Sequence, residues 1–142
     1  MTMRDPTTAM RLRGAAALEL AILLPLLVLL CFGITEGGRA IYQYNTIAKA
    51  TRDAARYLTT VPPGQGHSIA RCLALYGDRA CSGPLLLPAL DSATFAVKDA
   101  SNDAGHADVP AQGNGTTPTG RMNLVSVTIG GYPFQSVVPY VF

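Results

Sequence analysis

Residues 11–34 read RLRGAAALELAILLPLLVLLCFGI, and this stretch decides how the chain is organised. A basic segment ends at Gly14, small residues follow, and Glu19 stands just before a long apolar run. The segment from Ala15 to Ile34 has about 20 residues, which at about 1.5 Å per residue matches a hydrocarbon core about 30 Å thick. The sequence therefore predicts one transmembrane helix over residues 15–34.

The residues ahead of this helix predict its orientation. Arg4, Arg11 and Arg13 outnumber Asp5, the one acidic residue within residues 1–14. Because positive charge favours the cytoplasmic side of a membrane, we expect residues 1–14 to stay in the cytoplasm and the large C-terminal part to be extracytoplasmic.

Three kinds of N-terminal segment combine basic residues with an apolar run: a cleaved secretory signal peptide, an uncleaved anchor and a prepilin-type leader. A signal peptide has small residues after its apolar run, at the cleavage site. In this chain Ala15–Ala17 come before the run, and Thr35–Arg39 after it offers only a weak cleavage site. The pattern favours a prepilin-type leader, with an uncleaved anchor as the alternative.

The stretch RLRGAAALELAILLPLLVLLCFGITEGGRA resembles the N-terminus of TadE-like minor pseudopilins of tight adherence (Flp-type) pilus systems. The resemblance rests on the glycine, the offset of the carboxylate and the apolar length, and it extends to about Thr59. It implies that a prepilin peptidase cuts between Gly14 and Ala15, which makes Glu19 the fifth mature residue. The permissive backbone of Gly14 is also expected to let the helix start late.

Glu19 needs a specific explanation, because a carboxylate in a membrane helix costs about 2.5 to 3.5 kcal/mol on insertion scales. The resemblance implies that cleavage exposes the amine of Ala15 and that this amine pairs with Glu19 of a neighbouring subunit. The alternative is a carboxylate that lies within reach of the headgroups, favoured by the positive end of the helix dipole.

Pro25 lies inside the predicted transmembrane helix. Proline removes an amide donor and its ring clashes with the preceding turn, so the sequence predicts a kink. Such a bend either helps a subunit to pack around curved neighbours or is a tolerated membrane proline.

Residues 36–58 place apolar side chains largely along one side of a helix. We expect the helix to continue as an amphipathic stalk over residues 35–60, loosened at Gly37–Gly38 and ending near Thr59. Its basic residues are interpreted as a solvated face rather than a nucleic-acid site, because the formal net charge of the chain is only +2.

The composition of residues 61–142, the head, changes to turn formers and short β-prone runs. The predicted fold class is α+β and pilin-like: a long N-terminal transmembrane and stalk helix followed by a small antiparallel β-sheet. The expected head elements are a helix over 68–76, strands over 93–97 and 124–129, and a strand over 133–138 that pairs with 124–129 across Gly130–Gly131.

Cys72 and Cys81 stand nine positions apart in the head. In an oxidising compartment they predict a disulfide, which would stabilise a small core by about 2 to 3 kcal/mol. Metal binding by the pair is the weaker interpretation, since His67 and His106 are isolated. The pair is not part of the family resemblance.

Residues 99–120 are dense in turn formers and predict a flexible, exposed loop. Its glycines lack the lysine and spacing of a phosphate-binding loop, and Asp99, Asp103 and Asp108 do not follow the spacing of a known calcium loop. No nucleotide, metal or other cofactor site is predicted.

The sequence shows no catalytic constellation, because Ser68 and Ser82 lack a nucleophile elbow and neither histidine has an obvious orienting partner. We therefore expect a substrate of prepilin peptidase rather than an enzyme.

The resemblance implies a single-pass protein of the bacterial inner membrane, with a periplasmic head, that helps to initiate or assemble a tight adherence pilus used in surface attachment. Its N-terminal helix would meet other pilin-like subunits and the pilus assembly platform. The alternative is a permanently membrane-anchored extracytoplasmic binding module that does not enter a pilus.

Overall fold

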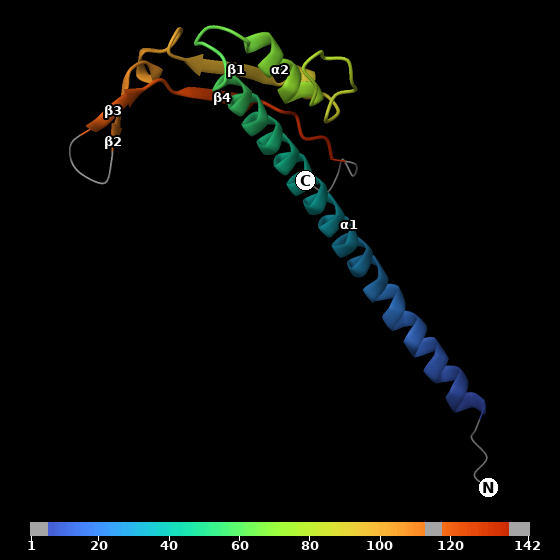
Figure 1. The fold of residues 1–142 in the computed structure, drawn as a ribbon. Helices are drawn as coiled ribbons and strands as arrows, with labels where there is room; N and C mark the ends of the chain where they lie inside the picture. Colours follow the sequence, from blue (N-terminus) through green and yellow to red (C-terminus); the bar gives the residue numbers. More distant parts are fainter. Residues whose placement is uncertain (1–5, 113–117, 137–142) are drawn as a thin grey trace. The chain divides into compact units, whose positions relative to one another are not determined.

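The structure, a computed structural model, describes residues 6–112 and 118–136 (Figure 1). One compact unit contains the first part of helix α1, up to Ala40, and a second contains residues Ile41–Gln135.

Helix α1 spans Pro6–Leu58, 53 residues in all, and continues through Pro25 and through Gly37 and Gly38. Its end agrees with the predicted end near Thr59, just before two prolines. The expectation of a late start at Gly14 was wrong. A single glycine costs a helix only about 1 kcal/mol, and proline in the first turn loses no intrahelical bond.

The part of α1 that begins at Ala15 is long and apolar enough to cross a membrane. Its leucines between residues 18 and 30 face outward, with Leu26 for example 67% exposed. Apart from Glu19, an apolar surface of this kind suits contact with lipid tails or with other helices.

Residues 59–136 form a small head whose main sheet is antiparallel. Helix α2 (His67–Tyr76) comes first, and strand β1 (Thr94–Asp99) pairs with strand β4 (Val125–Gly130), with Thr94 opposite Gly130 and Asp99 opposite Val125. The short helical turns η1 (Leu90–Ser92) and η2 (Ala104–His106) flank β1. These elements confirm the predicted α+β class, and α2, β1 and β4 lie within two residues of the predicted ranges.

The core of the head forms where the last turns of α1 meet α2 and the sheet. Ala54 and Leu58 of α1 are buried against Ala70 and Ala74 of α2, and alanine at these positions lets the two helices approach closely. One face of the sheet packs on this cluster through Phe95, Val97, Val125, Val127 and Ile129. Period-two alternation along both strands places these residues on the same face.

A second cluster lies under the segment that follows α2. Leu90 is 0% exposed and contacts Leu75, Leu87 and Ala93. The chain can leave α2 abruptly because Gly77 adopts a left-handed conformation (φ 71°) and donates its N–H to the carbonyl oxygen of Leu73 (3.0 Å).

Two sequence predictions about the head were wrong. Residues 99–120 were expected to form a flexible loop, but they contain regular structure. They include η2 and strand β2 (Val109–Gln112), which pairs with strand β3 (Pro118–Met122). Residues 133–136 form no strand, and β4 pairs with β1 instead. Proline at 133 cannot donate a ladder hydrogen bond. Val137 and Val138 lie outside the described residues.

Candidate functional site

The predicted processing site lies within α1. Gly14 and Ala15 follow the first two turns of the helix, so the bond between them is part of continuous helical backbone. Ala15 and Glu19 are separated by one helical turn and lie on the same face. A peptidase would therefore have to unwind this turn to reach an extended backbone.

Glu19 is exposed and is surrounded on α1 by exposed leucines, including Leu18, Leu20 and Leu23. Within the part of the chain that the structure describes, no side chain forms an ion pair or hydrogen bond with it. A carboxylate on an apolar surface is costly in lipid unless a partner or the polar headgroup region compensates its charge.

A second acidic residue of α1 was not singled out by the sequence. Glu36 is only 4% exposed and lies 3.3 Å from the guanidinium of Arg39, one helical turn later. The two residues form an i,i+3 ion pair just beyond the apolar run.

The most connected polar group of the head is Asp99, at the end of β1. Its Oδ2 accepts hydrogen bonds from the backbone N–H of Gly64 (2.8 Å) and from His67 Nε2 (2.7 Å). Its Oδ1 accepts from the backbone N–H of Ser101 (2.9 Å) and from the Ser101 hydroxyl (2.5 Å). One carboxylate therefore connects β1, the loop after α1 and the first residue of α2.

These hydrogen bonds stabilise the charged form of Asp99. Those from the Ser101 hydroxyl, from the Gly64 N–H and from His67 hold the pKa of the Asp99 carboxyl well below its usual range. Two donors on each oxygen also occupy the lone pairs that a ligand would need.

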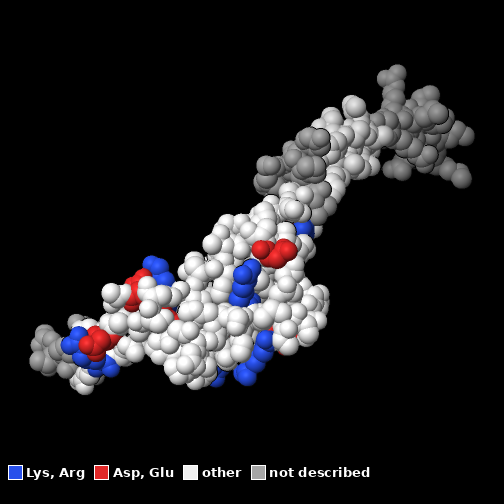
Figure 2. All heavy atoms as spheres, turned by 90° about the horizontal axis from the view of Figure 1, so that it is seen from above, with Lys and Arg blue, Asp and Glu red and all other residues white. Residues whose placement is uncertain are grey.

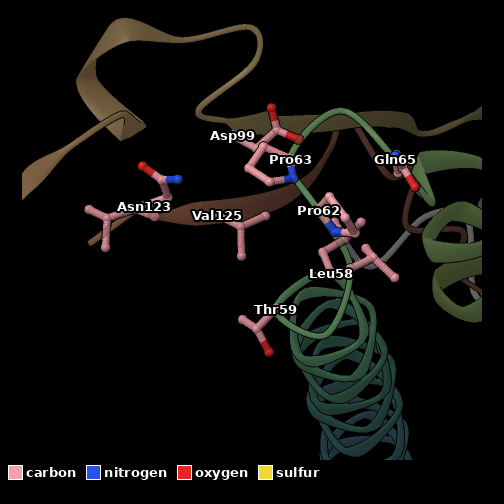
Figure 3. Close-up of a pocket in the computed structure, with 10 residues that line it drawn as sticks. Leu58, Thr59, Pro62, Pro63, Gln65, Asp99, Asn123 and Val125 are labelled. Atoms are coloured by element: carbon pink, nitrogen blue, oxygen red, sulfur yellow. The ribbon is translucent and has the colours of Figure 1, made fainter. Parts of the chain in front are cut away.

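A cavity of about 250 Å³ adjoins this carboxylate, and Figure 3 shows Asp99 beside Pro63 with Leu58 and Thr59 at the end of α1 below. The remaining lining residues are Val61, Pro62, Gln65, Asn123, Leu124 and Val125. Because Asp99 is already saturated by protein donors and is 4% exposed, its position indicates a structural role rather than a cation site.

The second histidine also has partners. His106 Nε2 lies 3.0 Å from Ser126 Oγ, and its Nδ1 lies 3.2 Å from Asp103 Oδ1. Asp103 in turn lies 3.1 Å from Lys98 Nζ. The contact with Lys98 lowers the pKa of Asp103 most. The contact with His106 and the hydrogen bond from the Gly105 N–H lower it further, to about 2. The expectation that neither histidine has an orienting partner was wrong, since His67 contacts Asp99 as well.

The order Asp103, His106, Ser126 resembles a catalytic triad in composition. A nucleophilic serine, however, stands on a sharp turn beside oxyanion donors, whereas Ser126 lies within extended strand β4. The Nδ1 atom of His106 is also not aligned for a hydrogen bond to Asp103 despite the short distance. The geometry indicates that these residues fasten η2 to the outer face of the sheet.

The two head cysteines are bonded in the structure. Cys72 lies in α2 and Cys81 in the segment after it, with their sulfur atoms 2.02 Å apart. The same segment donates the Leu86 N–H to the Leu75 carbonyl oxygen (2.8 Å). The disulfide therefore holds the segment that contributes Leu87 to the second core cluster.

Charged side chains of both signs are interspersed on the face seen in Figure 2. Arg52 and Arg56 of α1 are exposed, and neither forms an ion pair within the described residues. Two arginines one turn apart are typical of a solvated helix face.

Comparison with known proteins identifies the N-terminal part of the chain. Residues 14–56 match the model of a family described as TadE-like protein. The match begins at Gly14, the predicted cleavage glycine, and ends two residues before the end of α1. No curated protein and no solved structure gives a significant match to this chain. Residues 14–56, which include Glu19 and nearly all of α1 after the basic segment, are therefore similar to the TadE-like family.

Proposed function

We propose that this chain is a minor pseudopilin of a tight adherence pilus system and that prepilin peptidase removes residues 1–14. The observation that supports this best is the family match, which starts at Gly14 and includes Ala15 and Glu19. Among the described residues one helix, α1, is long and apolar enough to cross a membrane, which agrees with such a protein.

In this proposal α1 crosses the bacterial inner membrane once, with residues 1–14 in the cytoplasm and the head in the periplasm. The arginines before Ala15 support this orientation. The protein then helps to initiate or assemble the pilus, and thereby surface attachment.

Glu19 would be the assembly contact. After cleavage the new amine of Ala15 carries a positive charge, and pairing it with Glu19 of a neighbouring pilin-like subunit would neutralise both groups inside the lipid. The outward position of Glu19 supports an intermolecular partner. Other pilin-like subunits and the assembly platform would meet α1 along its exposed apolar surface.

The test is the mass of the mature N-terminus, measured on protein recovered from native membranes of cells with and without the peptidase. We expect a chain that begins at Ala15 only where the peptidase is present. Gly14→Leu should block cleavage by placing a bulky side chain at the scissile bond. Gly33→Leu is the matched control, because α1 leaves open space around Gly33.

Retention of residues 1–14 in cells with active peptidase would contradict the proposal. That result would favour a permanently anchored extracytoplasmic binding module instead.

A further inference from the structure

The polarity of α1 is inverted just beyond its apolar run. The buried side chains there, Glu36 and Gln43, are polar. The exposed ones are large and apolar or aromatic: Ile41 is 64% exposed, Tyr42 66% and Tyr44 73%. A helix in water shows the opposite arrangement, with apolar side chains inside and polar side chains outside.

The ordinary arrangement begins at Asn45 and continues to the end of α1. Over this part of the helix the buried side chains are apolar, namely Ala50, Ala54 and Leu58. The exposed side chains are all polar or charged, namely Asn45, Lys49, Arg52, Asp53 and Arg56. The exposed surface of α1 therefore changes from apolar to polar between Tyr44 and Asn45.

Tyr42 and Tyr44 lie on different sides of α1. Two residues along an α-helix turn by about 200°, so the two side chains point in nearly opposite directions. Tyr42 lines a groove together with Leu73 of α2, whereas Tyr44 lines another groove together with Thr128 of β4. A single neighbouring helix packs along one side of α1 and would leave one tyrosine in water. Lipid surrounds a helix on every side that its own chain leaves open.

Tyrosine is also the expected residue type where a helix leaves a membrane. Its ring is apolar and its hydroxyl is polar, and it is enriched at membrane–water interfaces for this reason. The helix from Ala15 to Tyr44 has about 30 residues and a length of about 45 Å, enough to cross the hydrocarbon core and both headgroup layers.

The acidic residues of α1 fit the same environment. Ionisable side chains within a membrane usually face protein and pair with one another, as the buried Glu36 does with Arg39 at 3.3 Å. Glu36 is the one acidic residue between Glu19 and Asp53. The exposed surface of α1 between these two residues therefore carries no carboxylate that would repel headgroup phosphates.

We propose that residues 35–44 of α1 lie in the outer leaflet of the membrane and that Tyr42 and Tyr44 bind the phospholipid headgroup layer around the helix. The tyrosine rings contact the upper acyl chains while their hydroxyls hydrogen-bond to headgroup oxygens. The water-exposed stalk then begins at Asn45 rather than at residue 35. The inference rests on the membrane crossing of α1, which is part of the proposed function, but on neither cleavage at Gly14 nor pilus assembly.

The test uses the absence of tryptophan from this chain. Single tryptophans are introduced as Tyr42→Trp and Tyr44→Trp into the purified full-length chain, which is then diluted into phosphatidylcholine vesicles so that neighbouring subunits are rare. Both tyrosines are exposed and tryptophan suits the same interface, so the fold should tolerate the changes. Asp53→Trp is the matched control: Asp53 is exposed, lines the same groove as Tyr42, and lies about 16 Å further along α1.

We expect lipid with a spin label on its headgroup to quench the fluorescence at positions 42 and 44 several-fold more than at position 53. Iodide in the water should quench position 53 several-fold more than the other two. Equal iodide quenching at all three positions, without quenching by the labelled lipid, would overturn the proposal and leave a protein neighbour as the partner of this surface. Lipid quenching at only one of the two tyrosine positions would also overturn it, because lipid surrounds both sides of the helix.

Leu26→Trp separates failure of this inference from failure of the proposed membrane crossing. A spin label deep in the acyl chains should quench position 26, since Leu26 lies in the middle of the apolar run. Quenching there, combined with positions 42 and 44 that iodide reaches freely, would overturn this inference alone. Free access of iodide to position 26 would overturn the membrane crossing as well.

Discussion

His67 Nε2 lies 2.7 Å from Asp99 Oδ2, and this contact joins the first residue of α2 to the last residue of β1 across 32 positions of sequence. Because the same carboxylate also accepts the N–H of Gly64, it determines how the chain turns after α1. The head therefore depends on one buried acidic residue for the relative position of its helix and its sheet.

Asp99→Asn should lower the thermal stability of the head by several degrees. The amide keeps the size of the carboxylate but offers one oxygen in place of two, which leaves two of its four donors without an acceptor. Thermal unfolding of the full chain in detergent, followed by near-ultraviolet circular dichroism, measures the change. Asp91→Asn is the control, since Asp91 is exposed in η1. Equal stability of the two variants would argue against the structural role of Asp99.

Acid should destabilise the head over a defined pH range. The pKa values of Asp99 and Asp103 are lowered by folding, that of Asp103 to about 2. In an unfolded chain aspartate has a pKa of about 3.9. A carboxyl whose pKa is depressed in the folded state contributes its stability above the unfolded value and loses it as the pH falls toward the folded value.

We therefore expect the melting temperature to be insensitive to these two groups above about pH 5 and to fall between about pH 4 and pH 2. The Asp99→Asn variant should show a shallower fall. A wild-type melting temperature that rose over this interval would contradict the sign of the effect.

Breaking the disulfide should loosen the segment after α2. In the chain-entropy model a loop of this size contributes about 2 to 3 kcal/mol, so Cys72→Ser with Cys81→Ser should lose about that much stability under oxidising conditions. Chemical denaturation of the full chain measures the loss. Reducing agent should lower the free energy of unfolding of the wild type to that of the double variant, and should leave the double variant unchanged. A double variant as stable as the oxidised wild type would contradict a stabilising role of the disulfide.

Truncation of Leu90 tests the second core cluster. Leu90 is 0% exposed, so Leu90→Ala should cost about 2 to 5 kcal/mol through lost burial and the cavity left behind. Leu86→Ala is the matched control, because Leu86 is half-exposed and should cost less. Comparable losses in denaturant titrations of both variants would show that the cluster is not closed around Leu90.

Glu19→Ala should leave membrane insertion and peptidase cutting intact and reduce incorporation into the pilus machinery, because only the pairing with a neighbouring amine is removed. Fractionation of membranes, N-terminal mass and pilus yield measure the three steps separately. Normal pilus yield with correctly processed protein would refute the pairing role of Glu19.

The sequence by itself determined the elements whose signal is local. The apolar length after Gly14 and the following periodicity predicted α1 to within one residue of its end, because every backbone bond of a helix is made within the segment. Alternation predicted β1 and β4 for a similar reason, since one face of each strand must be apolar to cover α1 and α2. The resemblance at residues 11–34 pointed to the family whose model matches residues 14–56.

Only the tertiary structure decided which strand β4 meets and which polar side chains gather. The hairpin expected across Gly130–Gly131 was reasonable from turn chemistry, but β4 pairs with β1, whose sequence lies some 30 residues earlier. The contacts of Asp99 with Gly64 and of His106 with Ser126 follow from that register and from the packing of α2. Side chains far apart in sequence become neighbours only once strand pairing and helix docking are set, and no local pattern encodes that choice.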